Sequence, residues 1–254
     1  MGSIPFTAYD FFGYLAQGFV FLLAVDASFV EDPTRFSPGA TESLVLITAA
    51  YVVGQLIGQL AGGLLETGLF DKTTVGFPSV NLFVERKPRH WVVTLVFGAY
   101  WRAFPTETRS RVLDRSGLAL SDLTRRSAAR YPGRLHLRHH HKDWKALAAD
   151  GEALYDHCYG ALKARDIDSG RLANLLNVYA FCRNMSIALA LGAIALVVGT
   201  LSGSAHTGAI SPGSWIAGAA FTAGGLFLRY LKIYRLFHEE IFTTYAELPE
   251  GPRP

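Results

Sequence analysis

Histidine and arginine side chains gather in one short stretch of this 254-residue sequence, and their types allow two kinds of chemistry. His136, His139 and His140 lie close together, so their imidazoles could ligate a metal ion. The same stretch also holds a run of cations that suits an anionic ligand. These cations are Arg125, Arg126, Arg130, Arg134, Arg138 and Lys142. The candidate ligands are a nucleotide, an oligonucleotide, an anionic lipid headgroup or an acidic partner protein from the cytosol.

Two enzyme families have spacings that are similar to parts of this stretch, and neither match is complete. His136 to His140 resembles the HxxHH box of membrane desaturases and hydroxylases, but that family needs further boxes for its di-iron site. The histidines at positions 90, 157, 206 and 238 stand alone in the sequence. Arg134 and His139 fit the Arg-x4-His spacing of HEPN ribonucleases, although Leu135 stands where that family usually has a polar residue. A metal-dependent or nucleolytic enzyme is therefore our third hypothesis, and we expect no cofactor.

A second set of polar side chains lies inside an apolar stretch, residues 43–65, that has the length of a membrane span. At ~100° per residue, four of them fall within a narrow arc of one helix. They are Thr48, Gln55, Gln59 and Glu66. Amide side chains are costly against lipid, so this polar stripe should face protein or water. Gly54, Gly58 and Gly62 recur every four residues, a pattern that favours close packing of another helix.

Three interpretations of the polar stripe remain open from the sequence. Gln55 and Gln59 could form hydrogen bonds inside the helix bundle of one subunit, since such bonds are common between spans. Alternatively, the stripe could line a water-filled path at the axis of an oligomer, with Glu66 as a ring of acids that favours cations. The third interpretation is a substrate pocket.

The composition places these side chains in a membrane protein. Half of the residues are hydrophobic, only 18% are charged, and the mean hydropathy is +0.22. Such values exclude a disordered chain and disfavour an ordinary soluble domain. Four windows, at about residues 8–29, 43–65, 184–203 and 213–232, have the length and apolarity of spans. We therefore predict an all-α, polytopic fold with four transmembrane helices, in which a helical cytoplasmic domain separates spans two and three.

The distribution of Lys and Arg predicts the orientation. Residues 67–183 hold nineteen Lys or Arg and eleven Asp or Glu, whereas the loop at 202–214 holds no charged side chain. Because positive charge stays on the cytoplasmic side, the long middle segment and both termini should be cytoplasmic. We thus expect spans one and two within residues 1–66, a basic helical cytoplasmic domain at 67–183, spans three and four at 184–232, and a cytoplasmic C-terminal helix extension and tail at 233–254. The predicted location is the bacterial inner membrane.

Within the cytoplasmic segment, turn residues and apolar periodicity predict several helices. They are expected at 107–115, ending at Gly117, and at 121–130, 142–149 and 152–165. The apolar run 91–101 is too short to span and is either an interfacial helix or a core helix. No helix breaker separates Gly170 from span three, which predicts one helix of some thirty residues. Span four should likewise continue to about Ala246, with Tyr230, Tyr234, Phe237 and Ile241 as core residues.

In layout, the chain resembles small four-span bacterial membrane proteins, including the membrane effectors of antiviral defence systems. The resemblance covers the order of spans and basic domain and depends on no diagnostic motif. It implies a homo-oligomer that perturbs the membrane when a signal reaches the cytosolic part. We therefore expect a homo-oligomeric channel or pore gated through the basic domain. The alternative is a non-conducting anchor or scaffold that binds an anionic ligand or a partner protein.

Overall fold

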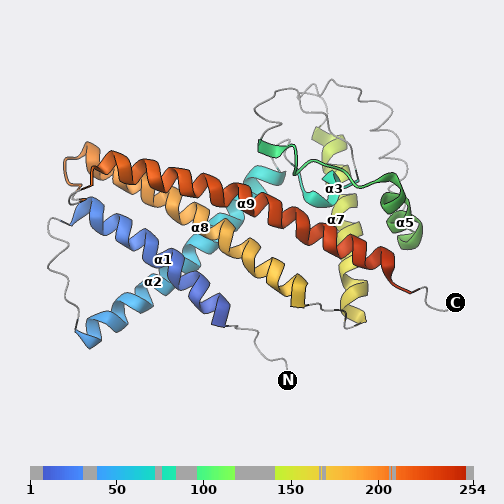
Figure 1. Cartoon of the computed structure of the whole chain (residues 1–254), viewed down its shortest axis with the longest axis horizontal. Coiled ribbons are helices and arrows are strands. Elements are labelled where there is room, and N and C mark those ends of the chain that lie inside the picture. The colour runs from blue at the N-terminus through green and yellow to red at the C-terminus, as the bar shows by residue number, and fades with distance from the viewer. Residues whose placement is uncertain are drawn as a thin grey trace. The chain divides into compact units, whose positions relative to one another are not determined.

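The computed structural model describes residues 8–30, 39–71, 76–83, 96–117, 141–165, 167, 170–205, 207 and 210–249, and their regular elements are all helices. In chain order they are α1 (Ala8–Phe29), α2 (Ala40–Ala61), the π-helical segment η2 (Gly62–Asp71), α3 (Pro78–Asn81), α5 (Thr106–Ser116), α7 (His141–Ala164), α8 (Gly170–Leu201) and α9 (Pro212–Glu247) (Figure 1). The predicted all-α class is thus confirmed for the described residues.

Three of these helices are long and apolar enough to cross a membrane. They are Ala40–Glu66, which joins α2 to the first part of η2, and the two long helices α8 and α9. The apolar part of α1 is shorter, Gly13–Phe29. α8 has 32 residues and α9 has 36 without interruption, which confirms both continuous helices predicted from the sequence.

The chain divides into two compact units. Unit 1 comprises residues 1–66 and 177–230, and unit 2 comprises residues 67–176 and 231–254. The division falls inside α8 and α9, so each of these helices contributes residues to both units. Unit 2 therefore includes the last part of α9, which corresponds to the helical extension predicted after span four.

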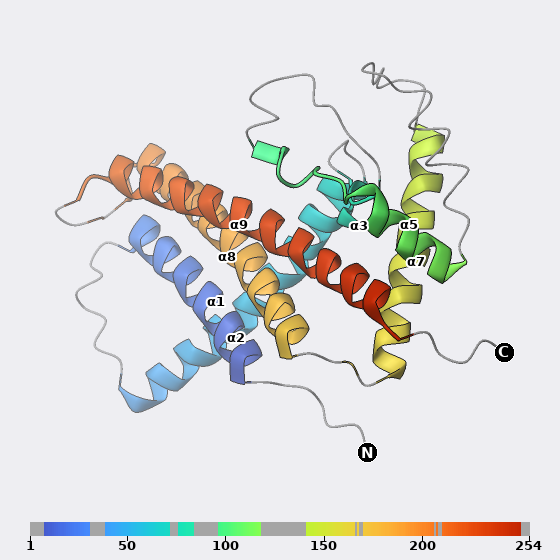
Figure 2. The ribbon, with the colours of Figure 1, turned by 45° about the vertical axis from the view of Figure 1, so that its right-hand side comes forward.

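Unit 1 is built on a close crossing of α1 and α2. A Cβ atom at Gly18 would lie 1.7 Å from the carbonyl oxygen of Ala50, and one at Gly54 would lie 1.9 Å from that of Tyr14. Only glycine lets the two backbones approach this closely. α8 and α9 lie side by side in both views (Figures 1 and 2), and Ser186 Oγ donates a hydrogen bond of 3.0 Å to the carbonyl oxygen of Ala223.

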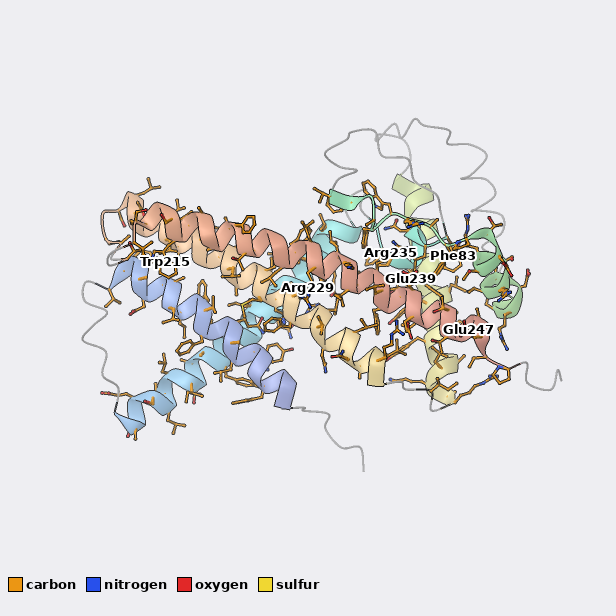
Figure 3. All side chains as sticks on the ribbon, viewed as in Figure 1. Phe83, Trp215, Arg229, Arg235, Glu239 and Glu247 are labelled. Carbon is orange, nitrogen blue, oxygen red and sulfur yellow. The ribbon has the colours of Figure 1, made fainter. Side chains whose placement is uncertain are left out.

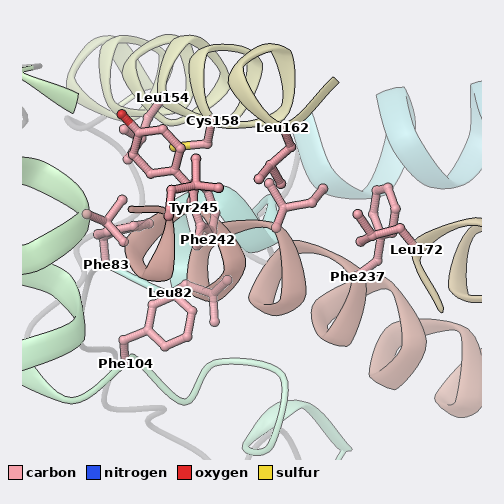
Figure 4. Packing of buried hydrophobic residues seen from close by; sticks show 13 residues of the cluster. Leu82, Phe83, Phe104, Leu154, Cys158, Leu162, Leu172, Phe237, Phe242 and Tyr245 are labelled. Atoms are coloured by element: carbon pink, nitrogen blue, oxygen red, sulfur yellow. The ribbon is translucent and has the colours of Figure 1, made fainter. Parts of the chain in front are cut away.

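The core of unit 2 is an apolar cluster in which α7 and the end of α9 meet the segments around α3 and α5 (Figure 4). Phe242 is fully buried, and its ring lies edge-on to Phe83 at 5.0 Å and to Phe104 at 6.4 Å between centroids. Cys158 of α7 belongs to the same cluster, and burial raises the pKa of its thiol to about 12. This thiol is therefore protonated at neutral pH and serves packing. Phe237 and Ile241 confirm the predicted core role of their stripe.

Charged side chains form ion pairs outside the apolar cluster of unit 2. On α9, Arg235 and Glu239 are one turn apart (Figure 3), and they form an ion pair of 3.6 Å. Arg235 Nη1 also donates to the carbonyl oxygen of Ala99. Arg171 pairs with Glu240 at 3.1 Å, which joins the first turn of α8 to the last part of α9. Such exposed or half-exposed pairs add little stability each, so the apolar cluster is the main source of cohesion in unit 2.

One local expectation was wrong. α7 is one helix from His141 to Ala164, although two helices were expected, at 142–149 and 152–165. A Cβ at Gly151 would lie 2.7 Å from Cγ2 of Val80, so this glycine lets α3 pack against α7 and does not end the helix. Residues 98–101 form a turn, and Tyr100 and Trp101 are buried within unit 2, which favours the core interpretation of their segment over the interfacial one. The helix expected at 107–115 is confirmed as α5, which ends at Gly117 with φ of 64°.

Candidate functional site

The polar stripe of α2 lies on the outward side of the helix within unit 1. Ala50, Ile57 and Ala61 are buried, and they mark the side that packs against the rest of the unit. At ~100° per residue, Thr48, Gln55 and Gln59 fall on the opposite side. Thr48 and Gln59 are exposed and Gln55 is half-buried. The stripe therefore points away from the helix bundle of its own chain.

Local hydrogen bonds account for two of these side chains. Thr48 Oγ1 donates to the carbonyl oxygen of Leu44 at 2.8 Å, one turn earlier in the same helix. Gln55 Nε2 donates to the hydroxyl of Tyr51 at 2.9 Å, also one turn earlier. The Tyr51 ring is fixed by α1, since it stacks on Phe11 at 5.2 Å and meets Tyr14 edge-on at 6.3 Å. The amide of Gln55 is thus bonded within α2. Gln59 is exposed and points away from the helix bundle, inside which the first interpretation expected it to form a hydrogen bond.

Glu66 is positioned differently from the rest of the stripe. Its Oε1 atom accepts hydrogen bonds from the hydroxyl of Tyr179 and from Nη1 of Arg183, both on α8. Nε of Arg183 donates to Oδ1 of Asn184 at 3.0 Å, and the guanidinium lies over the Tyr179 ring, 5.4 Å from its centroid. The exposed fractions are 35% for the Glu66 side chain and 15% for Arg183. Within unit 1, Glu66 is therefore the acid of an ion pair.

The π-helical segment η2 explains this position. The predicted arc assumed α-helical geometry as far as Glu66, but the chain changes at Gly62 to the wider i→i+5 pattern. Each residue then advances by less than ~100°, so Glu66 turns away from Gln59. Two adjacent glycines, Gly62 and Gly63, mark the change, and glycine is a poor α-helix former.

Gly58 of α2 and Gly62 of η2 also make room for the cluster formed by Glu66, Tyr179, Arg183 and Asn184. A Cβ at Gly58 would lie 2.9 Å from the Tyr14 ring and 3.3 Å from Nδ2 of Asn184, and one at Gly62 would lie 3.8 Å from Nη1 of Arg183. Gly54 and Gly58 thus lie against Tyr14 of α1, and Gly58 also lies against Asn184 of α8, whereas Gly62 borders the ion pair.

Further polar side chains are buried inside unit 1. Asn184 is 3% exposed and Gln17 of α1 is 2% exposed. Among the described residues, Oε1 of Gln17 has no hydrogen-bond partner. Buried polar groups without partners are costly, particularly in a bilayer. The interior of unit 1 thus contains polar side chains that the mean hydropathy of its helices does not indicate.

Other candidates from the sequence lie outside the described residues. They are Arg125, Arg126, Arg130, Arg134, Arg138, His136, His139 and His140, together with the helix expected at 121–130. Lys142 lies in α7, but its side chain is not described. Among the described residues, no three His, Cys, Asp or Glu side chains are grouped as a metal site would require. His238 is explained by packing, since its Nδ1 lies 3.0 Å from the carbonyl oxygen of Tyr234 and its ring lies beside Tyr155.

Sequence reasoning did not single out Tyr179 and Arg183 as site residues. A usable signal was present, because Arg183 lies at the cytoplasmic end of predicted span three and Glu66 lies at that of span two. Opposite charges at similar membrane depth usually pair.

No protein-family model, curated protein or solved structure matches the chain.

Proposed function

We propose that this chain is a subunit of a homo-oligomeric membrane channel or pore whose path is lined by Thr48, Gln55 and Gln59. The observation that supports it is the exposed position of Gln59, on the outward side of α2. Gln59 is six residues from the centre of the span Ala40–Glu66, or about 9 Å along the helix axis, so it would lie within a hydrocarbon layer of about 30 Å centred on this span. An amide there needs a polar partner. In an oligomer with copies of the chain around an axis, the Gln59 amide would face neighbouring copies and the water between them.

We further propose that α1 is the fourth span. Its 22 residues would extend about 33 Å, enough for a hydrocarbon core of about 30 Å. α1 also runs beside α8 over this distance: a Cβ at Gly192 would lie 2.9 Å from Cβ of Ala24, and one at Gly199 would lie 2.5 Å from the carbonyl oxygen of Ser28. Near its other end, Tyr14 and Asn184 of α8 both border Gly58. A helix that follows a span over this depth lies in the membrane with it.

With four spans, both termini and residues 67–183 lie on the same side of the membrane. The excess of Lys and Arg in residues 67–183 favours the cytoplasm as that side, in a bacterial inner membrane. The anion-binding candidates from Arg125 to Lys142 would then sense a cytosolic ligand or partner. α8 and α9 are continuous helices that extend from the spans into the cytoplasmic part. A conformational change caused by ligand binding in the basic segment would reach the spans along these helices. As in the defence effectors that the chain resembles, the proposed output is a change in membrane permeability.

Replacing both Gln55 and Gln59 by leucine should abolish ion flux through proteoliposomes while the oligomer persists, because an apolar lining removes water from the path. Flux is measured by dye release or ion-sensitive fluorescence, and the oligomer by cross-linking. Val52→Leu is the matched control, since Val52 is also exposed on α2 but is already apolar. Unchanged flux in the double variant would contradict the assigned lining.

If the wild-type protein assembles but conducts nothing, the pore proposal fails and the scaffold alternative is favoured. In that case the basic segment should matter and the stripe should not. Reversing the charges of Arg125, Arg126 and Arg130 would then abolish capture of an anionic partner in a pull-down, while the Gln55 and Gln59 double variant would capture it normally.

A further inference from the structure

Resting on the proposed pore, we infer that Arg183 sets its charge selectivity by neutralising Glu66, so that the path discriminates little between small cations and small anions. Between Glu42 and Glu66, along α2 and the first part of η2, the chain carries no Asp, Glu, Lys or Arg, and the assigned lining groups are hydroxyls and amides. Glu66 lies off the arc of Gln59, but its side chain is 35% exposed at the end of the same span, so its charge would act on ions at this mouth of the path.

An unpaired Glu66 would produce a cation-selective mouth. Symmetry would bring one carboxylate from every copy to the same depth, and such rings of acids concentrate cations. The attraction of a cation to these carboxylates adds up over the copies, because each unit charge acts over several ångströms through partly aqueous surroundings. This is the arrangement that the sequence suggested.

The geometry gives Glu66 a compensating charge instead. Arg183 Nη1 and the Tyr179 hydroxyl both donate to the same carboxylate oxygen. The field of an adjacent pair of opposite charges falls off faster with distance than that of a single charge. Every copy would therefore contribute almost no net charge at this depth.

The contacts of Arg183 fix this compensation in place. Its Nε atom donates to Asn184, and its guanidinium covers the face of the Tyr179 ring. With an exposed fraction of 15%, the side chain is more enclosed than the carboxylate that it pairs with. Arg183 is thus a positioned counter-ion, and its removal would uncover the charge of Glu66.

The test measures reversal potentials in planar bilayers that separate two concentrations of KCl. The wild-type protein should give a cation-to-anion permeability ratio near one. Arg183→Gln should raise this ratio on the order of tenfold, and Glu66→Gln should lower it by a similar factor. The double variant Glu66→Gln, Arg183→Gln should return close to the wild-type ratio, and Arg183→Lys should retain it.

Arg229→Gln is the matched control, because it removes an exposed cation from α9 in the same unit and should leave the ratio unchanged. If Arg183→Gln fails to assemble, the opposite shift in Glu66→Gln still tests the inference. Single variants that conduct with the wild-type ratio would overturn it and leave the pore intact. An absence of current in every variant and in the wild type would instead refute the proposed function on which it rests.

Discussion

Replacing Gly54 by valine is expected to separate α1 from α2 and to remove most of the folded, monodisperse protein from a detergent extract. The reason is steric, because even a Cβ atom at this position would lie 1.9 Å from the carbonyl oxygen of Tyr14. A backbone oxygen cannot move aside as a flexible side chain can. Overpacking typically costs about 1–3 kcal/mol, and this site lies at the upper end of that range or above it because the obstructing atom is backbone. Size-exclusion chromatography and thermal unfolding of the purified chain measure the loss.

A second glycine variant and a matched control make this prediction specific. Gly18→Ala should have a similar effect, since its Cβ would lie 1.7 Å from the carbonyl oxygen of Ala50. Gly13→Ala, in the same helix, meets no atom within 4 Å and should be tolerated or slightly stabilising. Normal yield and stability of Gly54→Val would show that α1 and α2 do not cross at these glycines.

The second large effect is expected in unit 2 from Phe242→Ala. Phe242 is fully buried and its ring contacts Phe83 and Phe104, so truncation leaves a cavity between α9 and the segments around α3 and α5. Removing a buried phenylalanine side chain costs about 3–5 kcal/mol, which for a chain of this size lowers the Tm by roughly 10 °C. Differential scanning fluorimetry of the full chain in detergent measures this change.

Leu176→Ala is the control for Phe242→Ala, because Leu176 also belongs to unit 2 but is 42% exposed. Its truncation should cost less than about 1 kcal/mol. Equal losses in the two variants would mean that the apolar cluster around Phe242 is not the main source of stability in unit 2.

The sequence predicted much of the helical layout because long apolar runs and helix breakers are strong local signals. The continuity of α8 follows from the lack of a breaker after Gly170, and the end of α5 follows from Gly117. Gly151 shows the limit of this reasoning. A glycine that ends a helix and a glycine that admits a neighbouring helix are identical in sequence, and only the position of Val80 distinguishes them.

The candidate site was predicted less completely, for a geometric reason. Thr48, Gln55 and Gln59 keep the predicted arc because α2 is regular as far as Ala61. Glu66 leaves it because η2 changes the number of residues per turn, and a π-helical segment has no dependable sequence signature beyond weak helix formers such as Gly62 and Gly63. The partner of Glu66, Arg183, is 117 positions away in the sequence, so their contact depends on how the spans pack.

The central claim is that the outward polar side of α2 is covered by other copies of the chain, and disulfide cross-linking in native membranes tests it most directly. Gln59→Cys is introduced into a chain in which Cys158 and Cys182 are replaced by alanine, and Phe221→Cys, 85% exposed on α9, serves as the comparison. Because apolar Phe221 can face lipid, it needs no partner chain. Our account predicts that oxidation converts the Gln59→Cys chain into covalent dimers much faster than the Phe221→Cys chain. A Gln59→Cys chain that stays monomeric, or that cross-links no faster than the comparison, would contradict it.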